Sequence, residues 1–303
     1  MRILSIIIPT FNRSEYLFNL LTDLINQDIK HISDFIVKYF IIVDGSTDET
    51  LNMLSDNFPF AIVLKGDGSW WFTRCINEGL KQAKSIKSDY FLLLNDDIRL
   101  PNTYLEKLIL GYEMLNINSL MGSLSIKVTK PNYILFSGIK SYNKLICKYE
   151  RYLPSNTIYD SNYHKGCMDS VELPARGMFF SFNVINQLDN FDPLLPQYGS
   201  DTDFCYRAFK KNIKCIINYD AIIYSFETQT SATSKYINSS FKEYFKGLFN
   251  KHSANSLFVT TYLIIKHINP SLWIFPMFVS IISEMNILFR KLLSDIKTSL
   301  SNN

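Results

Sequence analysis

The chain has 303 residues, of which 47% are hydrophobic and 19% charged, so it can bury a full core and most of it is not intrinsically disordered. Its formal net charge of +3 is too small to indicate a dedicated nucleic-acid-binding protein. The five cysteines include no Cys-x-x-Cys pair, which argues against a zinc site or a disulfide framework and indicates reduced thiols in the cytoplasm. The N-terminal apolar run is only about six residues long, so we do not expect a signal peptide.

Four strand–loop–helix units are predicted in the first 115 residues. Each unit has a short apolar run, then a polar loop, then apolar residues at helical spacing. The predicted strands are 3–8, 39–43, 61–64 and 90–94, and the predicted helices are 16–25, a short one near 51–54, 70–83 and 101–115.

This alternation predicts an α/β fold with a mostly parallel sheet flanked by helices. The loops 9–13, 44–48, 66–69 and 95–97 would then meet at the carboxyl ends of the strands, where open α/β sheets bind ligands.

The pattern after residue 116 is less regular. We expect a tyrosine-rich loop at about 150–170 and a helix at 204–211. The expected strands are 123–128, 134–139, one near 178–181, 215–218 and 221–224.

From about residue 239 the pattern is helical, and the stretches 256–268 and 272–289 are rich in apolar residues with basic flanks. Three interpretations stay open for this part of the chain. The helices could pack as a pair on the protein, lie as an amphipathic segment on anionic lipid, or span a membrane, which needs about 20 mostly apolar residues.

Two adjacent carboxylates follow the fourth predicted strand, in Asn95-Asp96-Asp97. A divalent cation with a bound phosphate is a natural partner for such a pair, because hard cations prefer oxygen ligands. The alternative is a turn or helix cap before Pro101.

Two further loops offer ligand contacts. Asp44-Gly45-Ser46-Thr47-Asp48 follows the second predicted strand, with turn and cap chemistry as its alternative. Gly66-Asp67-Gly68-Ser69 would let the backbone approach a ligand closely. Neither loop has the spacing of a P-loop or of G-x-G-x-x-G, so ATPase and dinucleotide-binding functions are disfavoured.

The aromatic residues of these segments could either pack in the protein or bind a ligand. Trp70 and Trp71 could pack in the core or form a platform for a sugar or base. The tyrosines of residues 141–164 could form a lid over an acceptor or simply pack.

Four motifs taken together resemble the family 2 glycosyltransferases of the GT-A fold. They are Ile6-Ile7-Ile8-Pro9-Thr10-Phe11-Asn12-Arg13, Val43-Asp44-Gly45-Ser46-Thr47-Asp48, Leu92-Leu93-Leu94-Asn95-Asp96-Asp97 and Gly199-Ser200-Asp201-Thr202-Asp203-Phe204. The resemblance covers roughly residues 3–230. The segment 66–73 resembles the subset that includes bacterial rhamnosyltransferase-like enzymes of surface polysaccharides.

The resemblance implies a GT-A (Rossmann-like) domain at 1–235, with a nucleotide-binding half at 1–115 and an acceptor half at 116–235, and a helical C-terminal extension at 236–303. It implies an inverting transferase that moves a sugar from a dTDP- or UDP-sugar to a hydroxyl of a growing glycan or lipid-linked glycan. The cofactor would be Mg²⁺ or Mn²⁺. The enzyme would contact no nucleic acid and would be cytoplasmic, with peripheral contact at the inner face of the cell membrane through its C-terminus as an alternative.

Residue roles follow from the same resemblance. Asp201 would be the general base, and Asp97 would bind the metal. The donor would contact Pro9, Thr10, Arg13, Asp44, Asp67, Gly68 and Asp96. The acceptor side would include Arg176, Gly177, Trp71 and Asp203.

The sequence departs from the family pattern at three places. Asn95 stands where the first acid of the metal motif is expected, and Ser200 stands where many relatives have Glu. No His follows the strand that ends at Tyr224, although Glu227 could replace it. A second hypothesis is therefore a non-catalytic nucleotide-sugar-binding protein. A third, a nucleotidyltransferase, would need a glycine-rich basic loop where Pro9–Arg13 stands.

Overall fold

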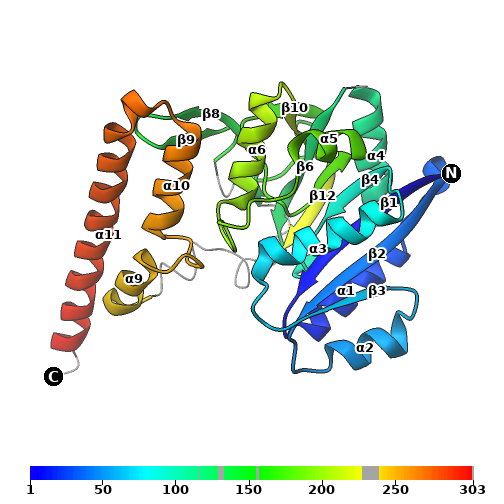
Figure 1. Ribbon diagram of the computed structural model, residues 1–303, viewed down its shortest axis with the longest axis horizontal. Coiled ribbons are helices and arrows are strands. Elements are labelled where there is room, and N and C mark those ends of the chain that lie inside the picture. Colours follow the sequence, from blue (N-terminus) through cyan, green and yellow to red (C-terminus); the bar gives the residue numbers. More distant parts are fainter. Residues whose placement is uncertain (116, 129–132, 155–156, 227–238, 302–303) are drawn as a thin grey trace.

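The computed structural model describes residues 1–115, 117–128, 133–154, 157–226 and 239–301. A central sheet carries helices on both faces, and the C-terminal helices lie beyond α6 (Ser200–Lys210), away from the sheet (Figure 1). The two termini therefore lie at opposite ends of the long axis of the molecule.

The first half of the chain forms the predicted strand–helix units. Its strands pair in the order β4-β1-β2-β3, and all three pairs are parallel. The elements are β1 (Arg2–Thr10), α1 (Ser14–Ile25), β2 (Phe35–Asp44), α2 (Thr50–Asn57), β3 (Ile62–Gly66), α3 (Trp71–Ser85), β4 (Tyr90–Leu93) and α4 (Tyr104–Leu115). The predicted α/β fold is confirmed here, because each apolar run is long enough for one buried strand.

The second half extends the same sheet with mixed directions. The strand β11 lies antiparallel between β4 and β6, and β12 lies parallel to β6. Short strands pair at the margins. The elements are β5 (Ile98–Arg99), β6 (Ser119–Lys127), β7 (Ile134–Phe136), β10 (Cys167–Ser170), β11 (Met178–Ser181), α5 (Phe182–Leu188) and β12 (Lys214–Ser225).

Three predictions for this half were wrong in detail. The strands expected at 215–218 and 221–224 form one strand, β12, because a bulge at Asn218 lets pairing with β6 continue. The expected loop at 150–170 is paired at both ends, since its first two residues end β9 (Lys148–Arg151), which forms a hairpin with β8 (Ile139–Asn143), and its last four form β10. Edge strands this short leave no clear alternation in the sequence.

The helix expected from Phe204 begins four residues earlier, at Ser200. Gly199 precedes it with a positive φ of 78°, which glycine adopts without strain. Asp201 and Asp203 then lie in the first turn, where carboxylates interact favourably with the helix dipole. The sequence interpretation counted only apolar spacing and therefore placed the start too late.

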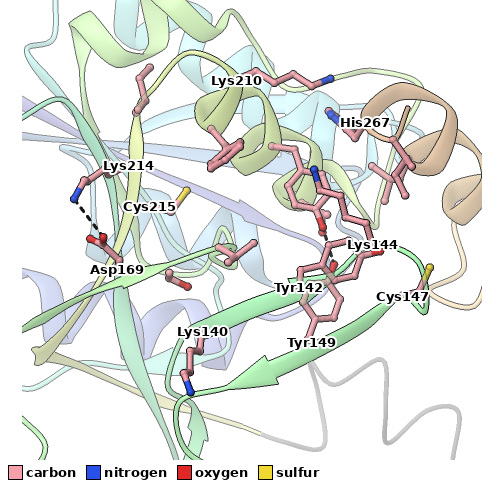
Figure 2. A pocket seen from close by; sticks show the side chains of 18 of the residues that line it. Lys140, Tyr142, Lys144, Cys147, Tyr149, Asp169, Lys210, Lys214, Cys215 and His267 are labelled. Atoms are coloured by element: carbon pink, nitrogen blue, oxygen red, sulfur yellow. Dashed lines mark hydrogen bonds and ion pairs between the residues drawn. The ribbon is translucent and has the colours of Figure 1, made fainter. Parts of the chain in front are cut away.

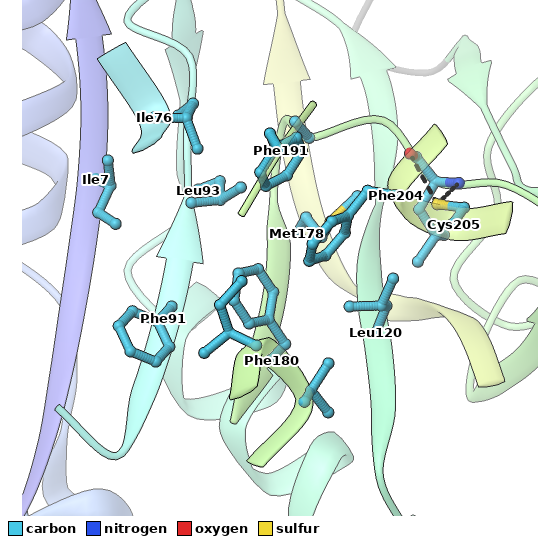
Figure 3. Close-up of a cluster of buried hydrophobic side chains, with 14 of the residues drawn as sticks. Ile7, Ile76, Phe91, Leu93, Leu120, Met178, Phe180, Phe191, Phe204 and Cys205 are labelled. Atoms are coloured by element: carbon cyan, nitrogen blue, oxygen red, sulfur yellow. Dashed lines mark hydrogen bonds between the residues drawn. The ribbon is translucent and has the colours of Figure 1, made fainter. Parts of the chain in front are cut away.

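The core has two layers, one on each face of the sheet. Ile7 of β1 faces the layer that includes α3, α5 and α6, whereas Ile6 and Ile8 face the layer that includes α1 and α4. Figure 3 shows the first layer, where Phe180, Phe191 and Phe204 bring strand, loop and helix together. The close approach of α3 to β1 requires Gly79, since a Cβ there would lie 2.5 Å from Ile7 Cγ2.

The C-terminal extension consists of α9 (Phe241–Leu248), α10 (Leu257–His267) and α11 (Ile274–Ser301). The helix α10 lies against α6, whereas α11 leaves a row of apolar side chains exposed. No helix in the described part of the chain is both long and apolar enough to cross a membrane.

Asp203 attaches α10 to α6. Its buried carboxylate accepts hydrogen bonds from Arg207 Nε at 2.8 Å, His267 Nε2 at 2.7 Å and Lys266 Nζ at 2.7 Å. Burial would raise the pKa of Asp203, but these three partners lower it well below its ordinary value. The extension is therefore held by a buried charge cluster.

We expect Asp203→Asn to lower the free energy of unfolding by about 1–3 kcal/mol, because it weakens buried hydrogen bonds to Arg207 and His267, whereas Lys266 keeps its ion pair with Asp192. Urea unfolding at neutral pH measures this change. Asp169→Asn is the matched control, since it removes only the exposed ion pair with Lys214 and should cost about 1 kcal/mol or less. Equal effects of the two substitutions would contradict this account of how α10 is attached.

Candidate active site

The loops that follow β1, β2, β3 and β4 meet at one edge of the sheet, as predicted. Thr10 Oγ1 donates to Asp96 Oδ2 at 2.8 Å, which joins the first loop to the fourth. Thr47 N donates to Asn12 Oδ1 at 2.7 Å, which joins the first to the second. The edge is thus one continuous polar surface built from segments far apart in the sequence.

Arg13 holds the two adjacent carboxylates. Its Nη1 donates to Asp96 Oδ1 at 2.8 Å and to Asp97 Oδ2 at 2.9 Å. Asp96 is 4% exposed and Asp97 is fully buried. Burial raises the pKa of Asp96 to about 6, even though the charge of Arg13 opposes this, and it also raises the pKa of Asp97. Arg13 therefore compensates a pair of carboxylates that burial destabilises.

Asp97 has an oxygen that fits a cation. Its Oδ1 is inaccessible to solvent and has no hydrogen-bond partner among the described residues. Mg²⁺ is usually held by one or two carboxylates together with substrate phosphates, so this oxygen suits a cation shared with a ligand. Within the described ranges no group of three or more His, Cys, Asp or Glu side chains is placed to hold a metal. Glu227, the predicted substitute for the absent His, lies outside those ranges.

Asp44 holds the loop that follows β3. Its Oδ1 accepts from Gly68 N at 2.8 Å, and its Oδ2 accepts from the backbone N–H groups of Trp70 and Trp71 at 3.0 and 2.9 Å. The two loops approach so closely that a Cβ on Gly45 would lie 2.6 Å from Gly68 N. Asp44 thus positions the Gly66–Trp71 loop, in addition to the donor contact predicted for it.

The other candidates of this loop lie nearer the surface. Asp67 is exposed, and its carboxylate accepts from Ser69 N at 2.9 Å. Trp70 packs against the core layer. Trp71 is 43% exposed, and its ring stacks on that of His252 in the C-terminal extension, with the two ring centroids 4.2 Å apart. Packing therefore accounts for Trp70, whereas the exposed ring of Trp71 can contact a ligand.

Arg176 is a cation that interacts electrostatically with both Asp97 and Asp201. Its Nε and Nη1 are inaccessible to solvent and have no hydrogen-bond partner in the described part of the chain. Burial lowers the pKa of Arg176, and the charges of Asp97 and Asp201 oppose this shift, which places both carboxylates within electrostatic reach. Gly177 follows with φ of 82°, and a Cβ there would lie 2.4 Å from Ile223 Cδ1, so only glycine fits.

Asp201 is a carboxylate in the first turn of α6. Burial raises its pKa, although backbone N–H groups, including that of Thr202 at 3.0 Å, oppose the shift. A carboxylate whose pKa is raised accepts a proton more readily than an exposed one, as a general base requires. Asp203, two residues on, points instead to α10, and its predicted acceptor contact stays a prediction.

Glu172 is the site residue that the sequence interpretation missed. Its Oε1 accepts from Thr202 Oγ1 at 2.6 Å, and its buried Oε2 has no hydrogen-bond partner among the described residues. Burial and the nearby charge of Asp201 raise the pKa of Glu172 to about 7. The one signal available in the sequence was an acid in the otherwise apolar run Val171–Pro174.

A cavity of about 820 Å³ opens beside Thr202 (Figure 2). The β8–β9 hairpin, β10, α6 and α10 surround it. Tyr142 and Tyr149 of the hairpin point into it (Figure 2), and Tyr206 of α6 also lines it. Two of the tyrosines predicted to lie on a loop therefore line a cavity from a paired hairpin.

Comparison with known proteins gives a family and a fold. Residues 5–147 match the model of Glycosyl transferase family 2. No curated protein matches the sequence. Two similar solved structures are the crystal structure of S. aureus TarS and that of S. aureus TarS 1–349 in complex with UDP. The first has 16% identity and a TM-score of 0.54, covering 87% of this chain and 43% of that one. The second has 16% identity and a TM-score of 0.51, covering 87% and 71%.

These findings support glycosyl transferase family 2 over residues 5–147 and a GT-A-like fold, as predicted. The chain spans less than half the length of the first TarS structure that it matches.

We expect Glu172→Gln to remove part of the pH dependence of stability. The folded protein keeps the Glu172 proton up to about pH 7, whereas the unfolded chain loses it near the ordinary pKa of 4.5. The free energy of unfolding therefore falls as pH rises through this window. The fall from pH 5 to pH 8 should be about 1–3 kcal/mol smaller in the variant, as measured by urea unfolding. Glu150→Gln, an exposed carboxylate paired with Lys140, should leave the slope unchanged.

Proposed function

We propose that the protein is an inverting glycosyltransferase that moves a sugar from a nucleotide diphosphate donor to a hydroxyl of a glycan. The observation that carries the proposal is the hydrogen-bonded group of Thr10, Arg13, Asp96 and Asp97 at the edge where the first four loops meet, with Arg176 within electrostatic reach of both Asp97 and Asp201. The family match over residues 5–147 supports it independently. The catalytic domain would span 1–235 and the extension 236–303.

The donor would occupy the edge formed by the first four loops. Thr10, Arg13 and Asp96 form one hydrogen-bonded group there, and Pro9, Asp44, Asp67 and Gly68 lie in the same loops. The S. aureus TarS 1–349 structure in complex with UDP favours a uridine donor, and the resemblance of 66–73 to rhamnosyltransferase-like enzymes favours a thymidine one. Both nucleotides therefore belong in the test.

The reaction needs a base on the acceptor side and positive charge on the leaving side. Asp201 would take the proton of the acceptor hydroxyl. At the same time the oxygen of that hydroxyl would bond to the anomeric carbon of the donor sugar, and the bond from this carbon to the diphosphate would break. Arg13 would hold the diphosphate oxygens, because guanidinium groups bind phosphate strongly, and Arg176 would add positive charge from the acceptor side. A divalent cation on Asp97 would add charge that stabilises the leaving diphosphate. A single displacement of this kind inverts the anomeric centre.

Nucleotide binding and turnover test the proposal together. We expect UDP or dTDP, but not GDP or CDP, to raise the melting temperature in the presence of Mn²⁺. A ligand at 100 times its Kd adds about 2.7 kcal/mol of stability. Asp97→Ala should lose the metal-dependent part of the shift. Asp201→Asn should keep the nucleotide shift but reduce turnover about 10²- to 10⁴-fold, because it removes the base alone.

The outcomes separate the remaining hypotheses. Nucleotide binding without turnover on any donor, in the unmodified protein, would favour the non-catalytic alternative. Turnover that survives in Asp201→Asn would contradict the assignment of the base. Absence of any nucleotide shift would contradict the donor site.

We also propose that the C-terminal extension contacts the inner face of the cell membrane. Phe278, Met285 and Phe289 of α11 are each more than 60% exposed, and they lie at the spacing of one helix face. Residues 239–303 contain seven Lys or Arg and three Asp or Glu, a net charge of +4, whereas the whole chain has +3. An apolar face on a basic segment suits anionic lipid.

Vesicle sedimentation tests this contact. We expect the protein to bind phosphatidylglycerol vesicles more tightly than phosphatidylcholine vesicles. Phe278→Asp with Phe289→Asp should weaken binding at least tenfold, since each buried phenyl group contributes about 1.5–3 kcal/mol. Met114→Asp, at an exposed apolar position of α4, is the control and should change nothing. Unchanged binding of the double variant would contradict the proposal.

A further inference from the structure

We propose that the cavity beside Thr202 binds a phosphate-bearing sugar of the acceptor. The cavity is separate from the donor edge, because none of the residues that line it belongs to the loops 9–13, 44–48, 66–69 or 95–97. Its volume of about 820 Å³ is in the range of small-molecule sites. The proposal rests on the proposed function, since it assigns the acceptor of that reaction.

One face of α6 lines the cavity, and this face begins next to the proposed base. Thr202, Tyr206 and Lys210 line it at intervals of four residues, which places them on the same side of the helix. Thr202 directly follows Asp201, the proposed base. The face extends about 12 Å from residue 202 to residue 210, at the usual helical rise. Asp201 itself points about 100° away from this face, so an acceptor bound along the face lies beside the proposed base rather than over it.

Three tyrosines form the wall opposite the apolar residues of α10. The ring of Tyr142 stacks on Tyr149 with centroids 4.4 Å apart and on Tyr206 at 6.0 Å, and the hydroxyl groups of Tyr149 and Tyr206 lie 3.2 Å apart. Aromatic rings with polar edges offer both apolar contact and hydrogen bonds. Sugar rings present the matching surface, with C–H groups on one face and hydroxyl groups at the edge.

The lining is strongly basic. It contains four lysines and a single acid, Asp169. Two of the lysines are neutralised, because Lys140 pairs with Glu150 at 2.9 Å and Lys214 pairs with Asp169 at 3.2 Å.

The other two lysines leave positive charge uncompensated. Lys210 donates to the carbonyl oxygen of Lys266 at 3.0 Å, and the ammonium group of Lys144 has no partner among the described residues. Lysine binds phosphate as a point charge. A neutral glycan would leave this charge unused, whereas a phosphate on the sugar would compensate it.

Calorimetric titration of the full chain tests the proposal with small probes. The probes are glucose 1-phosphate, glucose and farnesyl phosphate. We expect glucose 1-phosphate to bind at least tenfold more tightly than glucose. The double variant Lys144→Gln/Lys210→Gln should abolish this preference, and the Tyr142→Ala variant should weaken both sugars. Lys38→Gln, an exposed lysine of β2 outside the cavity, is the control and should bind as the unmodified protein does.

The farnesyl phosphate arm identifies the source of the phosphate. Lysine-dependent binding of farnesyl phosphate in competition with glucose 1-phosphate would support a phosphate that joins the glycan to a lipid carrier. Binding of glucose 1-phosphate alone would support a phosphate within the glycan itself. Equal binding of glucose and glucose 1-phosphate, or a preference that survives the double lysine variant, would overturn the proposal.

The UDP melting shift is measured on the same samples. It separates failure of this proposal from failure of the proposed function, because no residue of the cavity lies in the donor loops.

Discussion

Two adjacent carboxylates buried at the edge of a sheet constrain the whole site. Asp96 and Asp97 would repel one another and resist burial if nothing neutralised them. Arg13 bridges both from the loop after β1, and Thr10 adds a hydrogen bond from the same loop. The parallel order of β1 and β4 is what brings these groups together, since it sets the carboxyl ends of both strands side by side. The sheet and the charge cluster therefore depend on one another.

A second buried charge group extends the first toward the acceptor side. Arg176 lies within reach of Asp97 and Asp201, and Thr202 links α6 to Glu172. Several polar atoms of these residues have no hydrogen-bond partner in the described part of the chain, and buried groups of that kind cost free energy. Such a cost is expected where a ligand completes the hydrogen bonds. The arrangement of these side chains therefore favours binding of a charged ligand at the expense of the stability of the unliganded protein.

The C-terminal extension is attached next to the proposed acceptor side of the site. Asp203 anchors α10 to α6 by accepting hydrogen bonds from Lys266 and His267, and α10 in turn forms one wall of the cavity beside Thr202. Three successive residues in the first turn of α6 therefore contact different parts of the molecule. Asp201 is the proposed base, Thr202 lines the cavity, and Asp203 holds the extension in place. This division explains how an apolar, basic extension can be coupled to a polar site.

The sequence by itself predicted the strand–helix units of the first half and the loops that meet at the site. Ile6, Ile7 and Ile8 lie in a short continuous apolar run, and such a run with a polar loop after it carries local information about a buried strand. The position of Asp96 and Asp97 at this edge of the sheet was predicted in the same way, because they directly follow the fourth apolar run.

Only the tertiary structure showed Glu172, the separate roles of Asp201 and Asp203, and the cavity. Their properties come from contacts with residues far away in the chain: burial raises the pKa of Glu172, whereas His267, Lys266 and Arg207 lower the pKa of Asp203, and no local pattern encodes either shift. Apolar periodicity determined where the strands and helices lie, because it is local, whereas long-range packing decided what each polar side chain does.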